Sequence, residues 1–425
     1  MSDATQHPDQ QPAQNLAKGA SRSALVFIIL TVTIDMLGVG LVFPILPELV
    51  RELGGGDLGE SALLYGLLVS CFALIQFCVS PFIGLLSDRY GRRPVLLVSL
   101  AGLTLDYILL ALAPNLAWLV IARILAGLFS ATVSTANAYI ADVTPKEGRA
   151  AAFGILGAAF GVGFTVGPLI GGVLGGIDLQ YPFWAAAALS FGNFVFGYFM
   201  LPESLPPEKR TAMDLKKANP FSAILYIRRY AALAIFMTAL LLTGLAQQGL
   251  QGIWVLWSQA QFSWGVTEAG YSLAWVGVCM AFVQGYLVRI VVPKFGERRV
   301  IYGGFLISTI SFAFLPLITE GWMIYLAIFV HIIGWGTAGP ALNAVMSQNV
   351  PDTEQGLLQG TIASVNTVAM VIGPTFATWI FSMSVGENPV FPFLGSYYWF
   401  GAALFVATLI IVGLDNKKLS ATNTK

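Results

Sequence analysis

The sequence predicts an all-α membrane protein with twelve transmembrane helices arranged as two bundles of six. Three observations predict it: an apolar composition, twelve apolar segments of membrane-spanning length, and motifs that recur at a near-constant offset. Of the 425 residues, 56% are hydrophobic and 10% are charged, and the mean hydropathy is +0.76. Soluble domains carry about 25% charged residues, so this composition excludes a cytosolic enzyme and a nucleic-acid-binding protein.

A helix needs about 20 mostly apolar residues to cross the hydrocarbon core of a bilayer. In the first half of the chain, the predicted spans are 24–46, 62–86, 94–113, 117–141, 149–174 and 182–201. In the second half, they are 231–256, 269–291, 300–317, 322–344, 357–381 and 393–414. Residues 1–23 are polar and predict a disordered tail, and residues 47–61 predict a loop between the first two spans.

The positions of Lys and Arg predict the orientation, because these residues are retained on the cytoplasmic side. All of them except Arg51 and Arg123 lie in the two tails or in and beside the loops that follow spans two, four, six and eight. Both termini are therefore predicted to be cytoplasmic.

Internal repeats predict that the twelve spans form two related halves. The charged and Pro-rich residues 202–230 are typical of a linker, which separates bundles at 24–201 and 231–414 and leaves a cytoplasmic tail at 415–425. Gly167-Pro168 in span five has a counterpart 206 residues later in Gly373-Pro374, and the basic turn after span two recurs after span eight. Transporters built from such repeats bind their substrates between the halves, near the membrane midplane.

Away from the ends of the spans, three charged residues lie inside apolar segments: Asp35 in span one, Asp106 in span three and Arg123 in span four. Apolar surroundings disfavour a charged carboxylate, so such an acid can bind and release a proton as its access to water changes. We predict that these three residues couple transport to protons. The alternatives are structural acids paired with Arg123 or a hydroxyl, and an arginine that reaches the membrane edge. His331 in span ten is interpreted as structural.

Polar and aromatic side chains in spans of both halves predict a substrate cavity. Any one amide has the alternative role of a hydrogen bond between helices, and the aromatic residues have the alternative role of packing. The polar members of the predicted lining are Gln76, Asn137, Gln248, Gln251, Gln284, Asn343 and Asn366, and Trp254 supplies a stacking surface for a planar ligand.

Two motifs resemble signatures of the major facilitator superfamily. The first is the turn after span two, with Gly84, Asp88, Arg89, Gly91, Arg92 and Arg93; a turn that only orients the protein is its alternative. The resemblance implies the fold of that superfamily, with halves related by a pseudo-twofold axis. It also implies that Asp88 engages the amino end of span eleven and latches an outward-open state, with Arg92 and Asp142 as ion-pair partners. The second motif has Gly163, Gly167, Pro168 and Gly171 in span five and resembles the antiporter signature.

Over residues 24–414, the chain is similar to the tetracycline efflux proteins, a group of drug:proton antiporters. Matching segments include Thr31-Val32-Thr33-Ile34-Asp35, Asp106-Tyr107 and Pro202-Glu203-Ser204. The resemblance implies that Asp35 and Asp106 are required for transport and that Gln76 lies near the substrate path. The chain departs from the group at two positions that we add to the predicted cavity. Ser308 replaces an acid in span nine, and Met280 replaces a histidine in span eight.

These observations predict a proton-coupled secondary active exporter of a small amphipathic organic compound that works by alternating access. We expect a monomer in the bacterial cytoplasmic (inner) membrane, with no cofactor, no metal and no nucleic-acid partner. The alternatives are an exporter or importer of a metabolite or siderophore, and a non-transporting receptor or membrane enzyme. No Walker A motif or nucleophile elbow favours an enzyme. Because the C-terminal spans lack acids, we also predict poor export of cationic metal–tetracycline complexes.

Overall fold

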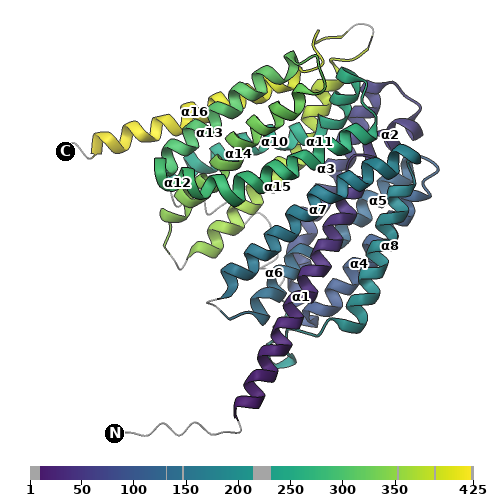
Figure 1. Ribbon diagram of the computed structural model, residues 1–425, viewed down its shortest axis with the longest axis vertical. Helices are drawn as coiled ribbons and strands as arrows, with labels where there is room; N and C mark the ends of the chain where they lie inside the picture. Colours follow the sequence, from purple (N-terminus) through teal and green to yellow (C-terminus); the bar gives the residue numbers. More distant parts are fainter. Residues whose placement is uncertain are drawn as a thin grey trace.

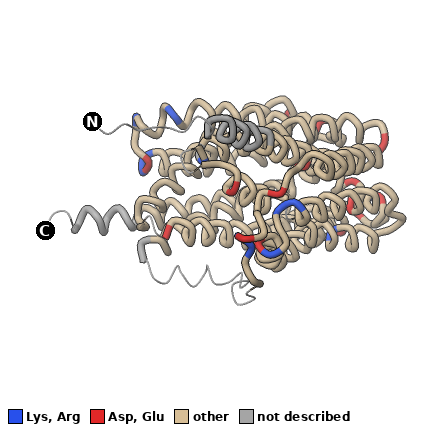
Figure 2. The backbone as a smooth tube through the Cα atoms, turned by 90° about the horizontal axis from the view of Figure 1, so that it is seen from below, with Lys and Arg blue, Asp and Glu red and all other residues tan. Residues whose placement is uncertain are grey.

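The computed structural model describes residues 10–130, 132–145, 148–213, 231–351, 354–386 and 389–422. Within these residues the secondary structure is helical, with no strand, and twelve helical spans are long and apolar enough to cross a membrane (Figure 1). Most of each helix carries no charged residue (Figure 2). The prediction of twelve spans is therefore confirmed.

The helices fall into two sets of six spans. The first set is α1 (Gln10–Val42), α2 (Leu46–Gly54), α3 (Leu58–Tyr90), α4 (Arg92–Ala111), α5 (Leu116–Phe129), α6 (Thr132–Val143), α7 (Arg149–Ile177) and α8 (Tyr181–Met200). Here α5 and α6 make up one span, and α2 is too short to be one. The second set is α10 (Ala231–Phe262), α11 (Val266–Phe282), α12 (Val288–Phe295), α13 (Glu297–Phe314), α14 (Met323–Gln348), α15 (Gln355–Ser382) and α16 (Ser396–Thr422). A π-helical turn, Val283–Leu287, joins α11 to α12 as one span.

Two segments differ from the prediction. Helix α1 begins at Gln10, so residues 10–23 are helical rather than disordered; several of them are good helix formers that extend the first span. Residues 1–9 and 214–230 of the predicted tail and linker lie outside the described residues. The predicted loop 47–61 contains most of α2, which has a proline at its start and is followed by Gly55, with a φ of 58°.

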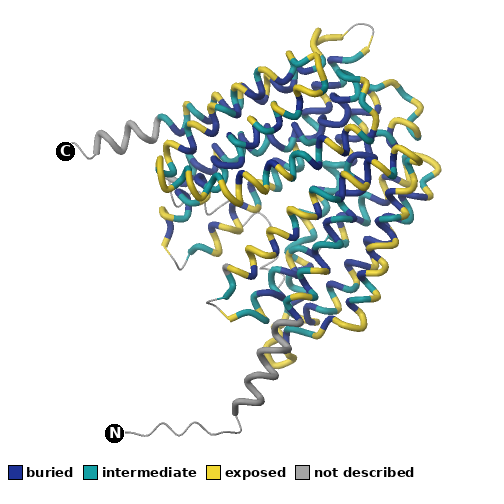
Figure 3. Tube along the Cα trace, viewed as in Figure 1, coloured by how far each residue is buried: buried dark blue, intermediate teal, exposed yellow. Residues whose placement is uncertain are grey.

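Each set packs as its own bundle. In the first, α1 packs against α7 and α8, and α4 packs against α5 and α8; in the second, α10 packs against α15 and α16, and α13 against α14 and α16. Buried residues concentrate where helices face one another (Figure 3). Between the bundles, α3 packs against α15 and α7 against α11. These pairs are equivalent under the internal repeat, as a pseudo-twofold relation requires.

The backbone angles of two glycines agree with the internal repeat. Gly91 lies between α3 and α4 with a φ of 107°, and Gly296 lies between α12 and α13 with a φ of 77°. Positive φ angles of this kind favour glycine. The repeated sequence thus builds the same kind of sharp helix-to-helix turn in each bundle.

The glycines of span five bring α7 against α1. Gly163, Gly167 and Gly171 recur every four residues, so they share one face of α7, and a Cβ atom on any of them would collide with α1. At Gly167, the added Cβ would lie 2.7 Å from Cα of Gly40. Pro168 lies within the same helix, and its Cδ would lie 2.9 Å from a Cβ added at Gly40. This part of the predicted antiporter motif is therefore a close helix contact.

We expect Gly167→Val to destabilise the protein by about 1–3 kcal/mol, because the larger side chain forces α1 and α7 apart. Gly157→Val is the matched control on the same helix, since a Cβ at Gly157 meets no atom within 4 Å. Thermal unfolding of the purified protein in detergent measures both. Equal melting temperatures for the two variants would contradict the packing role.

The two bundles meet at one end of the molecule. We call the end with Asp88 and Gly296 the motif end, and the opposite end, with α2, the far end. At the far end, Thr267 Oγ1 donates to the Gly172 carbonyl (3.0 Å), and Gln259 Nε2 donates to Glu48 Oε2 (3.0 Å). Toward the motif end, the bundles diverge (Figure 1). There, a Cβ atom added at Gly84 of the gate motif would meet no atom within 4 Å, so no helix packs closely against Gly84 in this conformation.

Candidate functional site

A cavity of about 300 Å³ lies among helices of both bundles, and α1, α3, α4, α5 and α6 form most of its wall. It contains all three charged residues that the sequence places inside spans: Asp35, Asp106 and Arg123. Gln251 of α10 and Met370 of α15 contribute the side of the second bundle. The charges that are costly in a membrane thus share one cavity, which is typical of a functional centre.

Asp35 faces this cavity from α1 with only 5% of its surface exposed. Its Oδ1 atom is buried and has no hydrogen-bond partner, and neither has Oγ1 of Thr132, which lines the same cavity from α6. An unpaired buried carboxylate pays a large desolvation cost when it is charged. Asp35 is therefore a buried acid without a compensating cation.

Asp106 and Arg123 form a buried ion pair between α4 and α5. Arg123 Nη2 lies 3.0 Å from Oδ1 and 2.9 Å from Oδ2 of Asp106, and the Asp106 side chain is 1% exposed. Of the sequence alternatives for Arg123, pairing inside the protein is the one observed. The pair leaves Arg123 Nε buried without a partner.

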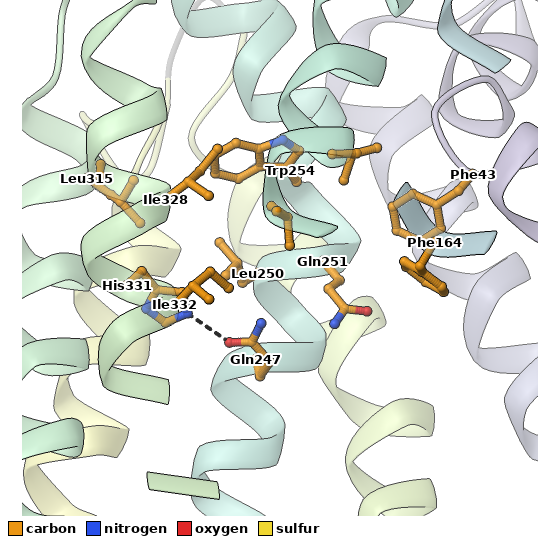
Figure 4. A pocket seen from close by; sticks show the side chains of 13 residues that line it. Phe43, Phe164, Gln247, Leu250, Gln251, Trp254, Leu315, Ile328, His331 and Ile332 are labelled. Atoms are coloured by element: carbon orange, nitrogen blue, oxygen red, sulfur yellow. Dashed lines mark hydrogen bonds between the residues drawn. The ribbon is translucent and has the colours of Figure 1, made fainter. Parts of the chain in front are cut away.

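A second, smaller pocket of about 80 Å³ adjoins the cavity on the side of the second bundle (Figure 4). Gln247, Gln251 and Trp254 line it from α10, and His331 lines it from α14. His331 Nε2 lies 3.0 Å from Gln247 Oε1. The sequence analysis missed Gln247 and selected its neighbour Gln248. The spacing of residues 247, 251 and 254 could have identified Gln247, since it places three residues on one helix face.

Three of the ten predicted cavity residues line these two cavities: Gln76, Gln251 and Trp254. The other seven are Asn137, Gln248, Met280, Gln284, Ser308, Asn343 and Asn366, and they line neither. Gln248 packs against Gly373 of α15, and Ser308 is fully buried beside Gly334 of α14. Both therefore serve contacts between helices.

The other five residues of that set also lie outside both cavities. Met280 Sδ accepts a hydrogen bond from Gln284 Nε2 at 3.2 Å, and Gln284 is exposed. Asn343 and Asn366 are also exposed, and Asn137 is half-buried. Whether a polar residue lines the cavity depends on the direction in which its side chain leaves the helix. The polarity of a residue does not predict that direction.

The predicted gate motif forms an ionic network at the motif end. Arg92 contacts Asp88 (2.6 Å) on one side and Asp142 (3.0 Å) on the other, so the ion pair expected between Arg92 and Asp142 is present. The carboxylate of Glu203 accepts from the backbone N–H groups of Arg92 (2.8 Å) and Arg93 (3.3 Å), at the amino end of α4. Asp88 is thus held within its own bundle in this conformation.

The other motif residues lie at the same turn. Arg93 Nη2 donates to the backbone carbonyl of Tyr198, and the Arg89 guanidinium lies 5.3 Å from the centre of the Tyr90 ring. Gly91 provides the positive φ of the turn. None of these residues is near the central cavity, so the gate motif and the buried charges are separate features.

Twelve apolar spans in two bundles, with a shared cavity that holds buried charges, define a membrane transporter. The chain matches the Major Facilitator Superfamily over residues 28–374 and 294–422. It is 39% identical over 389 residues to the class C tetracycline resistance protein of Escherichia coli, covering 92% of this chain and 96% of that protein. It is 34% identical over 399 residues to the class D tetracycline resistance protein of Salmonella ordonez, covering 93% and 98%.

A solved structure agrees with the fold: the human organic anion transporter MFSD10 (TETRAN) has a TM-score of 0.69 at 22% identity, covering 92% of this chain and 99% of that one. The chain belongs to the Major Facilitator Superfamily. It is a transporter of small molecules rather than an enzyme, and an integral protein of the cytoplasmic (inner) membrane.

Proposed function

We propose that the protein is a proton-coupled antiporter that exports a small amphipathic organic compound, with Asp35 as its exchangeable proton site. The observation that carries this proposal is the cavity itself. It holds one buried acid without a cation, Asp35, beside a second acid that is already neutralised, Asp106 with Arg123. The relatives named as tetracycline resistance proteins support export of a drug-like compound.

In this mechanism, substrate binding lowers the proton affinity of Asp35, so that a neutral side chain at this position weakens substrate binding without preventing it. A proton on Asp35 removes the unpaired charge and lets the empty transporter change conformation. A substrate that enters the cavity supplies polar contacts and displaces that proton. Asp106 and Arg123 hold each other neutral as a pair, so Asp35 is the acid that exchanges a proton without breaking an ion pair.

The arrangement of the bundles supports alternating access. We propose that the motif end faces the cytoplasm, because Lys and Arg concentrate there. The contacts between bundles at the far end then close the outer side, and the diverging helices correspond to an inward-open state. One chain forms the whole cavity, which is consistent with a monomer that acts within the lipid bilayer.

We expect Asp88→Asn to enrich this inward-open state further, because the variant loses the negative charge that the gate-motif resemblance assigns to the amino end of span eleven. Such an interaction contributes about 0.3–2 kcal/mol, so the shift is partial. Distances between spin labels on α3 and α15 at the motif end report it. An unchanged distance distribution would contradict the latch.

We also expect weaker export of the metal–tetracycline complex than of metal-free tetracycline. Among the described residues, no acid of the second bundle lines either cavity. Ser308, which stands where the tetracycline efflux proteins have an acid, is buried between helices and does not line the cavity. The preference for the metal-free drug therefore follows from the lack of acids in the cavity wall and not from Ser308. Uptake into inverted vesicles, with and without Mg²⁺ chelation by EDTA, measures the difference. Equal rates would contradict it.

Export itself is tested in a bacterium that lacks its own drug pumps. We expect the protein to raise the tolerance to amphipathic drugs and to lower their accumulation, and a protonophore should abolish both effects. An importer would instead raise accumulation. Increased drug uptake in the energised cells would overturn the proposed direction of transport.

A further inference from the structure

The small pocket beside the central cavity opens onto the same space. Phe43 in the turn after α1, Phe164 of α7 and Gln251 of α10 line both cavities, so they form the border between them. The two phenylalanine rings lie 6.2 Å apart at their centres. Figure 4 shows them on the side of the pocket opposite His331. The two cavities therefore adjoin at these two rings and Gln251.

The wall of the small pocket is apolar except at three side chains. Apolar side chains form most of it, and the majority of these come from α10, α11 and α14. The polar exceptions are Gln247, Gln251 and His331, and none of the described lining residues is an acid, a lysine or an arginine. This surface suits a small, uncharged part of a molecule.

His331 fixes the orientation of the Gln247 amide. Its ring is buried, with Nε2 bound to Gln247 Oε1, and it packs edge-on against Phe312 with the ring centres 5.2 Å apart. The bond occupies the carbonyl oxygen of Gln247. The amide nitrogen, which has two donor hydrogens, points away from His331 (Figure 4). Gln247 thus presents a fixed donor to an otherwise apolar pocket.

We propose that this pocket is a second substrate subsite, which binds a small, uncharged terminal group of the ligand and recognises a carbonyl or phenol oxygen there through the Gln247 amide. His331 is a positioning residue that acts through Gln247. This inference rests on the proposed transport of amphipathic compounds. It assigns the parts of the ligand to the two cavities: the polar end and the rings lie in the central cavity with Asp35, Asp106 and Arg123, and the terminal group extends past Phe43 and Phe164 toward α14.

Equilibrium binding of metal-free tetracycline to the purified full-length protein, in detergent with EDTA, tests the subsite. We expect the Kd to rise about tenfold in Gln247→Leu, as the loss of one neutral hydrogen bond of ~1.4 kcal/mol implies. A similar rise is expected in His331→Leu, and His331→Gln should restore most of the affinity because it can still donate to Gln247. Thr243→Val is the matched control on α10, since its hydroxyl bonds only to its own helix.

The positioning role predicts non-additivity. If His331 acts only through Gln247, the double variant Gln247→Leu/His331→Leu binds no more weakly than the weaker single variant. Additive losses, an unchanged Kd in Gln247→Leu, or no binding of tetracycline by the wild type would overturn the subsite. Tight binding by the wild type without any proton-driven transport would instead refute the proposed function and leave the subsite standing.

Discussion

Asp35→Asn is expected to abolish proton-driven transport while the protein remains folded and still binds substrate. Asparagine has nearly the same shape as aspartate but carries no exchangeable acid, and Oδ1 of Asp35 has no partner whose loss would destabilise the fold. Substrate uptake into proteoliposomes with an imposed pH gradient measures the effect, and we expect uptake to fall to the level of empty liposomes.

The control for this variant is Asp178→Asn, an acid that caps the loop after α7 through the backbone N–H of Gln180 (2.7 Å) and lies outside the cavity. We expect wild-type uptake from it. Full proton-driven uptake by Asp35→Asn would show that another group carries the proton.

Arg123→Leu is expected to cause the largest loss of stability. It leaves the carboxylate of Asp106 buried without its cation, and removing one member of a buried ion pair costs about 3–5 kcal/mol. The double variant Asp106→Asn/Arg123→Leu removes both charges and should recover much of that stability, although we expect it to stay inactive in transport. Melting temperatures in detergent compare the three proteins.

Two outcomes would contradict this account of the pair. An Arg123→Leu variant as stable as the wild type would show that Asp106 is not held as an anion by Arg123. A double variant less stable than Arg123→Leu would show that the two side chains stabilise the fold by packing rather than by charge.

The sequence predicted the helical spans well because hydrophobicity over about 20 residues is a strong signal. The start of α1 and the presence of α2 were harder to predict. Residues 10–23 are polar, so hydrophobicity does not show that the helix continues through them. Helix α2 has nine residues, and its amphipathic pattern is hidden in a segment that reads as a loop.

The sequence predicted the charged residues of the candidate site but not its neutral polar residues. Charges inside spans are rare and costly, so Asp35, Asp106 and Arg123 stood out, and the structure brings all three to one cavity. Neutral amides carry no such signal. Gln247 and Gln248 are adjacent and chemically identical, yet one lines the pocket and the other packs against α15. The direction of each side chain around its helix depends on packing between helices, which the sequence alone does not supply.

The most direct test of the central claim is proton release on substrate binding. Purified protein in weakly buffered detergent solution is mixed with metal-free tetracycline and with a library of amphipathic compounds, and a pH-indicator dye records the released protons. Our account predicts that a transported compound releases protons from the wild type and that Asp35→Asn binds the same compound without releasing any. Binding without proton release in the wild type, or undiminished release in Asp35→Asn, would contradict it.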